Sequence, residues 1–142
     1  MRLMVPGVFI LFCFCALARA DETVDPKAAG SGRATYLTHC ASCHGNAAKG
    51  DGPVAASLKN KVPDLTSLPL KDGKFDYDRI RTSVDGQQSV PSHGTRDMPV
   101  WGKVFASPKG EGYAQTEIWT LMQYIKSLQR AQPEHPAQPK QE

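Results

Sequence analysis

The feature that most limits the fold of this chain is a five-residue stretch in which two cysteines directly precede a histidine, Cys40-Ala41-Ser42-Cys43-His44. The order C-x-x-C-H is associated with covalent attachment of haem. Two cysteines three positions apart can reach the two vinyl-derived carbons on one edge of a porphyrin. The adjacent histidine then places its imidazole beneath the iron. We therefore expect Cys40 and Cys43 to hold one haem c covalently and His44 to ligate its iron.

Two other kinds of site also use a C-x-x-C pair. A thioredoxin-like redox pair would need an α/β scaffold, and the sequence has no run of alternating strands. A zinc site would need four ligands, generally from a second Cys/His pair, whereas the other histidines (His39, His93 and His135) are scattered along the chain. The pattern as a whole therefore favours haem.

The N-terminus has the layout of a secretory signal peptide. An apolar run at residues 3–17 follows Met1-Arg2 and leads into Ala18-Arg19-Ala20. This run is shorter than the roughly 20 residues that cross a bilayer comfortably. We expect residues 1–20 to be cleaved and the protein to be exported to the periplasm with no stable membrane insertion. It would be membrane-anchored only if the segment were retained.

Cleavage would change the composition of the mature chain. Cys13 and Cys15 would leave with the signal, so Cys40 and Cys43 would be the only thiols, without a conventional disulfide framework. Loss of two arginines would lower the 17 basic residues to 15, against 14 acidic ones. Because no dense basic run exists either, nucleic-acid binding has no electrostatic support. The remaining 122 of 142 residues suffice for one compact domain.

Apolar periodicity predicts a small all-α fold. Because the C-x-x-C-H stretch predicts one covalently bound haem, we expect three to five helices wrapped around it. We expect a flexible lead at 21–29, a single compact domain at 30–130 and a disordered Pro/Gln-rich tail at 131–142. The predicted helices run from Ser31 or Gly32 to about His39, from Asp76 to Val84, and from about Thr116 to Gln129.

The boundaries of these elements follow from capping residues and breakers. Asp76 and Thr116 are the expected N-caps, and Gly86 is expected to stop the middle helix. Residues 45–64 should be mostly loop, with a short helical turn near 54–58. Residues 87–109 should form a long ordered loop, which is uncommon in a compact domain unless a buried cofactor fixes it.

The sequence resembles the class I c-type cytochromes over about residues 30–130. Gly32, Tyr36 and Cys40 match the first-helix pattern of that family, and Leu121 and Tyr124 in LMQYIKSL match its last helix. The resemblance implies that these two helices cross closely, with the glycine admitting the backbone of the other helix.

The resemblance extends to a candidate for the sixth iron ligand. Met98 lies in DMPVWG, which is similar to the methionine-ligand loop of the family, and it follows His44 by 54 residues. A methionine ligand raises the reduction potential relative to a second histidine. His93, five residues upstream, is the alternative and would give a low-potential bis-histidine site. We favour Met98.

Three further residues are expected around the haem. A ligating histidine normally donates its other ring proton to a fixed acceptor. Val62-Pro63-Asp64-Leu65 resembles the segment that supplies this carbonyl in the family, so Pro63 is the candidate acceptor and Leu65 would pack against the ring. Trp101 would pack at the haem edge, although an ordinary core role suits it equally.

The simplest function is one-electron transfer by a non-enzymatic carrier with transient redox protein partners. Two alternatives stay open from the sequence. The chain would be a haem subunit of a dehydrogenase or oxidase complex, or, if Met98 dissociates readily, a ligand-binding protein or weak peroxidase.

Overall fold

The computed structural model describes residues 23–86 and 98–129. In this part of the chain there are helices and no strand, with one isolated bridge between Lys71 and Lys74. The helices are α1 (Pro26–His39), α2 (Ala41–His44), the 3₁₀ helix η1 (Ala55–Ser57), α3 (Tyr77–Asp85), α4 (Trp101–Ala106) and α5 (Glu111–Ser127). The expected all-α class is therefore confirmed. The predicted signal, the tail and His93 lie outside the described residues.

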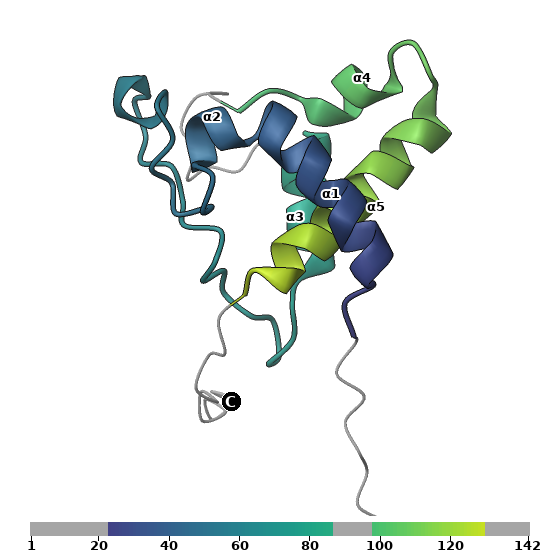
Figure 1. Ribbon diagram of the computed structural model, residues 1–142, viewed down its shortest axis with the longest axis horizontal. Helices are drawn as coiled ribbons and strands as arrows, with labels where there is room; N and C mark the ends of the chain where they lie inside the picture. The colour runs from purple at the N-terminus through teal and green to yellow at the C-terminus, as the bar shows by residue number, and fades with distance from the viewer. Residues whose placement is uncertain (1–22, 87–97, 130–142) are drawn as a thin grey trace, which may run out of the picture.

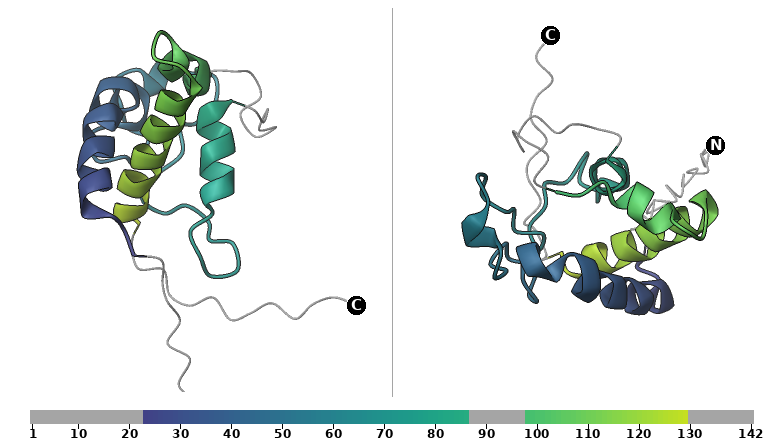
Figure 2. Two further views of the ribbon diagram at one scale, coloured as in Figure 1. Left: turned by 90° about the vertical axis from the view of Figure 1, so that its right-hand side faces the viewer. Right: turned by 90° about the horizontal axis from the view of Figure 1, so that it is seen from above.

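The C-terminal helix α5 is the hub of the fold. It contacts α1, α3 and α4, and the left view of Figure 2 shows it lying between α1 and α3. Its buried positions supply much of the core: Ala114, Ile118, Leu121, Met122, Gln123, Tyr124 and Ile125. None of the described helices is long and apolar enough to cross a membrane.

The first and last helices cross closely, as Figure 1 shows, and Gly32 lies at the crossing. A Cβ atom at this position would overlap the carbonyl oxygen of Thr120 and would lie 2.8 Å from the backbone nitrogen of Leu121. One turn further on, the buried ring of Tyr36 packs at 5.2 Å from that of Tyr124. The close crossing that the family resemblance implied is therefore present.

The start of α1 corrects the sequence-based prediction. The helix begins at Pro26, not at Ser31 or Gly32, so residues 26–29 form helix and are not part of a flexible lead. The cause is the cap: the carboxylate of Asp25 accepts hydrogen bonds from the backbone of Lys27 and Ala28 at 2.9 and 3.1 Å. Proline at the first helical position adds a pre-set φ angle.

The start of α5 and the presence of α4 also differ from expectation. Helix α5 begins at Glu111, and Thr116 is not its cap, because its hydroxyl donates to the Gly112 carbonyl within the helix at 2.9 Å. Helix α4 occupies part of the predicted long loop. Its Trp101 and Phe105, four residues apart, stack with ring centroids 5.7 Å apart, which stabilises this short helix.

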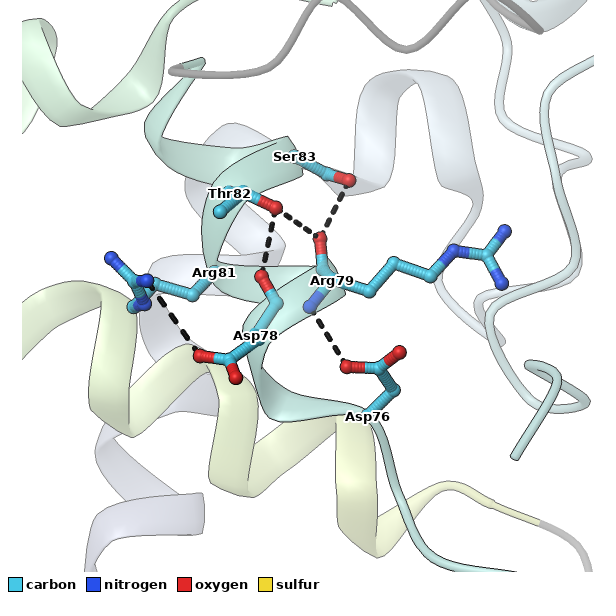
Figure 3. A network of polar contacts seen from close by, with 6 residues as sticks. All are labelled: Asp76, Asp78, Arg79, Arg81, Thr82 and Ser83. Carbon is cyan, nitrogen blue, oxygen red and sulfur yellow. Dashed lines mark hydrogen bonds and ion pairs between the residues drawn. The ribbon is translucent and has the colours of Figure 1, made fainter. Parts of the chain in front are cut away.

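Helix α3 begins and ends as the sequence predicted, within one residue. The Asp76 carboxylate caps it by accepting from the backbone N–H of Arg79 at 3.0 Å. Gly86 ends it in the left-handed conformation, with φ of +77°. Figure 3 shows the polar contacts that line the outer side of this helix, made by Asp76, Asp78, Arg79, Arg81, Thr82 and Ser83. The predicted helical turn near residues 54–58 is present as η1.

The close crossing generates a stability prediction. Gly32→Ala should lower the free energy of unfolding of the haem-loaded protein by about 1–3 kcal/mol, because the new methyl group forces the two helix backbones apart. Gly30→Ala is the matched control in the same helix, since no atom lies within 4 Å of its added Cβ. That change should raise stability by about 0.5–1 kcal/mol through helix propensity. Denaturant unfolding of both variants measures the contrast, and equal effects would contradict the crossing.

Candidate haem-binding site

The C-x-x-C-H stretch continues directly from α1. The backbone N–H of Cys40 donates to the Tyr36 carbonyl at 2.8 Å, and the N–H of His44 donates to the Cys40 carbonyl at 2.9 Å. Both cysteines and the histidine therefore lie within one helical turn, in α2 and its first flanking residue. Their positions are fixed relative to α1 and, through the crossing, relative to α5.

Both cysteines are free thiols, but their surroundings differ. Cys40 is buried and belongs to the hydrophobic core cluster, whereas Cys43 is half-buried. Burial, followed by the neighbouring Cys43, raises the pKa of the Cys40 thiol to about 12. The reactive thiolate is thus disfavoured at Cys40 in the folded chain. An uncharged thioether suits this apolar position better than the thiolate that a zinc site requires.

The ring of His44 is oriented by the backbone of a distant segment. Its Nδ1 lies 3.4 Å from the carbonyl oxygen of Pro63, nineteen residues further along the chain. A proton on Nδ1 donated to this carbonyl would make Nε2 the ligating atom. Such a contact fixes the tautomer and the orientation of a metal-ligating histidine.

The segment that carries Pro63 is itself fixed by local hydrogen bonds. The carboxylate of Asp64 accepts from the backbone N–H and the hydroxyl of Thr66 at 2.8 and 2.6 Å, which forms a tight turn. The N–H of Leu65 donates to the carbonyl of Ala48 at 2.7 Å. The acceptor for His44 is therefore held on a rigid loop.

A residue that the sequence did not single out completes this support. Gln129 follows the end of α5, and its amide donates to the Leu65 carbonyl at 2.7 Å while its oxygen accepts from the Leu68 N–H at 3.0 Å. It thereby ties the Pro63 segment to the hub helix. Its amide also donates to the Ile125 carbonyl at 2.8 Å, but Leu65 and Leu68 lie more than sixty residues away, so no local sequence pattern indicated this supporting role.

The loop after His44 folds back onto the same turn. The N–H of Gly50 donates to the His44 carbonyl at 2.8 Å, and that of Gly52 donates to the Cys43 carbonyl at 3.1 Å. A Cβ at Gly52 would lie 2.6 Å from the carbonyl carbon of Cys43, so only glycine permits this approach. The hydroxyl of the buried Tyr36 donates to the Gly45 carbonyl at 2.6 Å.

Three of the other candidate residues gather on the core cluster that contains Cys40. Met98, Leu65 and Trp101 are partly buried and pack against it. Trp101 also packs against the ring of His39, with centroids 5.2 Å apart, in addition to Phe105. The structure thus brings candidate residues from three separate segments, the Cys40 turn, the Leu65 loop and the Met98–Trp101 stretch, onto one apolar cluster, while their roles toward haem stay predictions.

The residues present fit a covalently bound haem. Two free thiols and an imidazole share one turn, the imidazole has a backbone acceptor, and an apolar cluster adjoins them. Within residues 23–86 and 98–129, no group of three or more histidine, cysteine, aspartate or glutamate side chains is placed to hold a metal ion. Such a group is what the zinc alternative would need.

Comparison with known protein families identifies a family that this chain matches. The family model described as Cytochrome c matches residues 29–129, a stretch that contains every candidate site residue. No curated protein and no solved structure matches the chain.

The buried hydroxyl of Tyr36 leads to a prediction on stability. Tyr36→Phe should lower the free energy of unfolding by about 1 kcal/mol, because the Gly45 carbonyl loses this donor and keeps only the Ala48 N–H, at 3.0 Å. Tyr113→Phe, at a tyrosine that is 37% exposed, is the control and should have a smaller effect. Equal losses from both variants would contradict a special role for Tyr36.

The contribution of Tyr36 to stability should also depend on pH. Burial, with the nearby Cys40, Tyr124 and Asp51, raises the pKa of Tyr36 in the folded chain, whereas an unfolded tyrosine has a pKa of about 10. The stabilisation by neutral Tyr36 is therefore fully present below about pH 10 and is lost as the pH rises toward the folded value. Unfolding measured between pH 7 and pH 11 should show the wild-type advantage over Tyr36→Phe shrinking above about pH 10. A constant difference would exclude this linkage.

Proposed function

The chain belongs to the cytochrome c family, and from this membership we propose that it is a periplasmic one-electron carrier with a single haem ligated by His44 and Met98. Membership itself implies a covalently bound haem c and haem-based electron transfer. The number of haems, the second ligand and the role as a free carrier are the further content of the proposal.

The observation that supports the proposal is that two candidate ligands of different chemistry, an imidazole and a thioether, adjoin one core cluster. Cys40, Cys43 and His44 share a turn, and the imidazole faces the Pro63 carbonyl. The partly buried thioether side chain of Met98 packs against the cluster that includes Cys40. When bound, haem iron supplies a one-electron couple by cycling between its ferrous and ferric forms.

The protein's part in this chemistry is to hold both ligands still. The Pro63 carbonyl fixes the orientation of the His44 ring, and the turn at Asp64 fixes that carbonyl. A methionine that stays bound leaves no open position for a substrate, which favours a carrier over a peroxidase. Little then has to rearrange when the electron moves.

Export and partner choice complete the proposal. The apolar residues 3–17 followed by Ala18-Arg19-Ala20 support secretion, and the two cysteines outside that segment fit covalent haem attachment in an oxidising compartment. Partners are expected to be redox proteins that bind briefly through a small interface.

The sixth ligand is tested by spectroscopy of the haem-loaded protein. Ferric wild type should show the near-red band of methionine-ligated iron, and Met98→Ala should abolish it and lower the reduction potential, because a thioether stabilises ferrous iron. Met122→Leu is the matched control: this methionine is 5% exposed in the core, and its substitution should keep both properties.

Three results would contradict the proposal at different levels. A high-spin ferric wild type without the band would refute the carrier with His/Met ligation. Loss of low-spin character on His93→Ala, but not on Met98→Ala, would assign the ligand to His93. The protein would also be expressed with the haem-attachment machinery, denatured and weighed by mass spectrometry. A mass equal to that of the apoprotein would refute covalent attachment through Cys40 and Cys43.

A further inference from the structure

Met98 lies just before α4, so its position depends on whatever fixes the start of that helix. Helices α3 and α4 are in contact, and the contact involves the last residues of α3. Asp85 and Gly86 meet Val100 and Gly102 there. These four residues are called the α3–α4 clasp below.

The first half of the clasp joins Gly86 to Val100. Gly86 ends α3 with φ of +77°, and a Cβ atom added to it would lie 2.7 and 2.9 Å from the two methyl carbons of Val100. The Val100 side chain therefore packs directly on the glycine backbone. Any side chain at position 86 would push Val100 away.

The second half joins Asp85 to Gly102. Gly102 is buried in α4, and a Cβ atom added to it would overlap the Asp85 carboxylate and would lie 3.0 Å from the Asp85 carbonyl oxygen. The first turn of α4 thus approaches the end of α3 at both backbone and side-chain level. Both halves need a glycine, one on each helix.

Chain length links this clasp to Met98. Val100 is only two residues beyond Met98, and an extended chain spans at most about 3.6 Å per residue, so the clasp limits Met98 to within about 7 Å of a fixed Cα atom. We propose that the α3–α4 clasp positions Met98 as the iron ligand, with Gly86 and Gly102 as positioning residues. This inference rests on the proposed function, because it presumes that Met98 is the sixth ligand.

The clasp matters for Met98 because an iron ligand tolerates little displacement. A site of this kind works when its groups are held within about 0.5 Å of the productive arrangement. A methyl group introduced into the clasp must shift Val100 or the first turn of α4, and Met98 shifts with them. The sulfur–iron bond then weakens, and an external ligand competes with it more easily.

The chain offers two matched pairs of variants for the test. Gly102→Ala is compared with Gly112→Ala, since both are helical glycines and nothing lies within 4 Å of the second one. Gly86→Ala is compared with Gly73→Ala, since their φ angles are +77° and +74° and only the first has a neighbour. The second pair therefore carries the same backbone strain and separates it from the loss of the clasp.

Two properties are measured. The first is imidazole binding to the ferric haem-loaded protein, monitored by the loss of the near-red band. The second is the reduction potential. Gly86→Ala and Gly102→Ala should bind imidazole at least about tenfold more tightly than wild type does, consistent with the usual cost of overpacking. Both should have a lower potential. Gly73→Ala and Gly112→Ala should match wild type in both properties, even if Gly73→Ala unfolds at a lower denaturant concentration.

The outcomes distinguish a failure of Met98 ligation from a failure of the clasp. A ferric wild type without the band would refute Met98 ligation and the clasp's role together. A wild type with the band, and four variants with equal imidazole affinity, would refute the clasp alone. If Gly102→Ala does not retain a haem-bound fold, the Gly86 pair decides independently. In addition, Asp85→Ala should partly restore ligation to Gly102→Ala, since it removes the carboxylate that the new methyl overlaps.

Discussion

The close approach of α1 and α5 at Gly32 is the contact on which the rest of the structure depends. Helix α1 continues into the turn that carries Cys40, Cys43 and His44, while α5 contacts both α3 and α4. The crossing therefore fixes the position of this turn relative to α3, α4 and α5. Because the backbones nearly touch there, the aromatic pair Tyr36–Tyr124 can pack in the next turn. A side chain at position 32 would push the two helices apart and would also separate the rings of Tyr36 and Tyr124.

Two glutamines, Gln123 within α5 and Gln129 just after its end, tie this helix to other segments in addition to its apolar face. Gln123 is 1% exposed; its oxygen accepts from the Asp25 N–H at 3.0 Å and its amide donates to the Tyr77 hydroxyl at 3.3 Å. Gln129 binds the Leu65–Leu68 segment in the same way. A chain with few helices has much backbone outside regular structure, and buried polar groups of that backbone need partners. Amide side chains, which donate and accept together, meet that need where the loops approach the hub.

Local patterns predicted the elements whose ends depend on nearby residues. Helix α3 followed from Asp76, Gly86 and the apolar spacing between them. The all-α class was also predicted, whereas the close α1–α5 crossing was implied only by the family resemblance at Gly32 and Tyr36. The early start of α1 was missed because its first turns carry Gly30, Ser31 and Lys27 in place of an apolar stripe, although Asp25-Pro26 was a readable capping signal. Helix α4, with only six residues, is too short for periodicity to reveal. The support from Gln129 depends on tertiary contacts that no local pattern contains.

The two sides of the site are held by different kinds of interaction. Around His44, backbone hydrogen bonds from Gly50 and Gly52 fix the turn of Cys43 and His44, and the bonds around Asp64 fix the Pro63 segment. For Met98, the proposed sixth ligand, the proposed clasp acts through downstream neighbours, by the packing of Val100 on Gly86 and of Gly102 on Asp85. Directional bonds define a position more narrowly than packing does, since dispersion contacts are individually weak and tolerate small displacements. Strain introduced anywhere near the site should therefore appear first on the methionine side. In the proposed site, His44, which shares its turn with Cys40 and Cys43, is the ligand expected to persist.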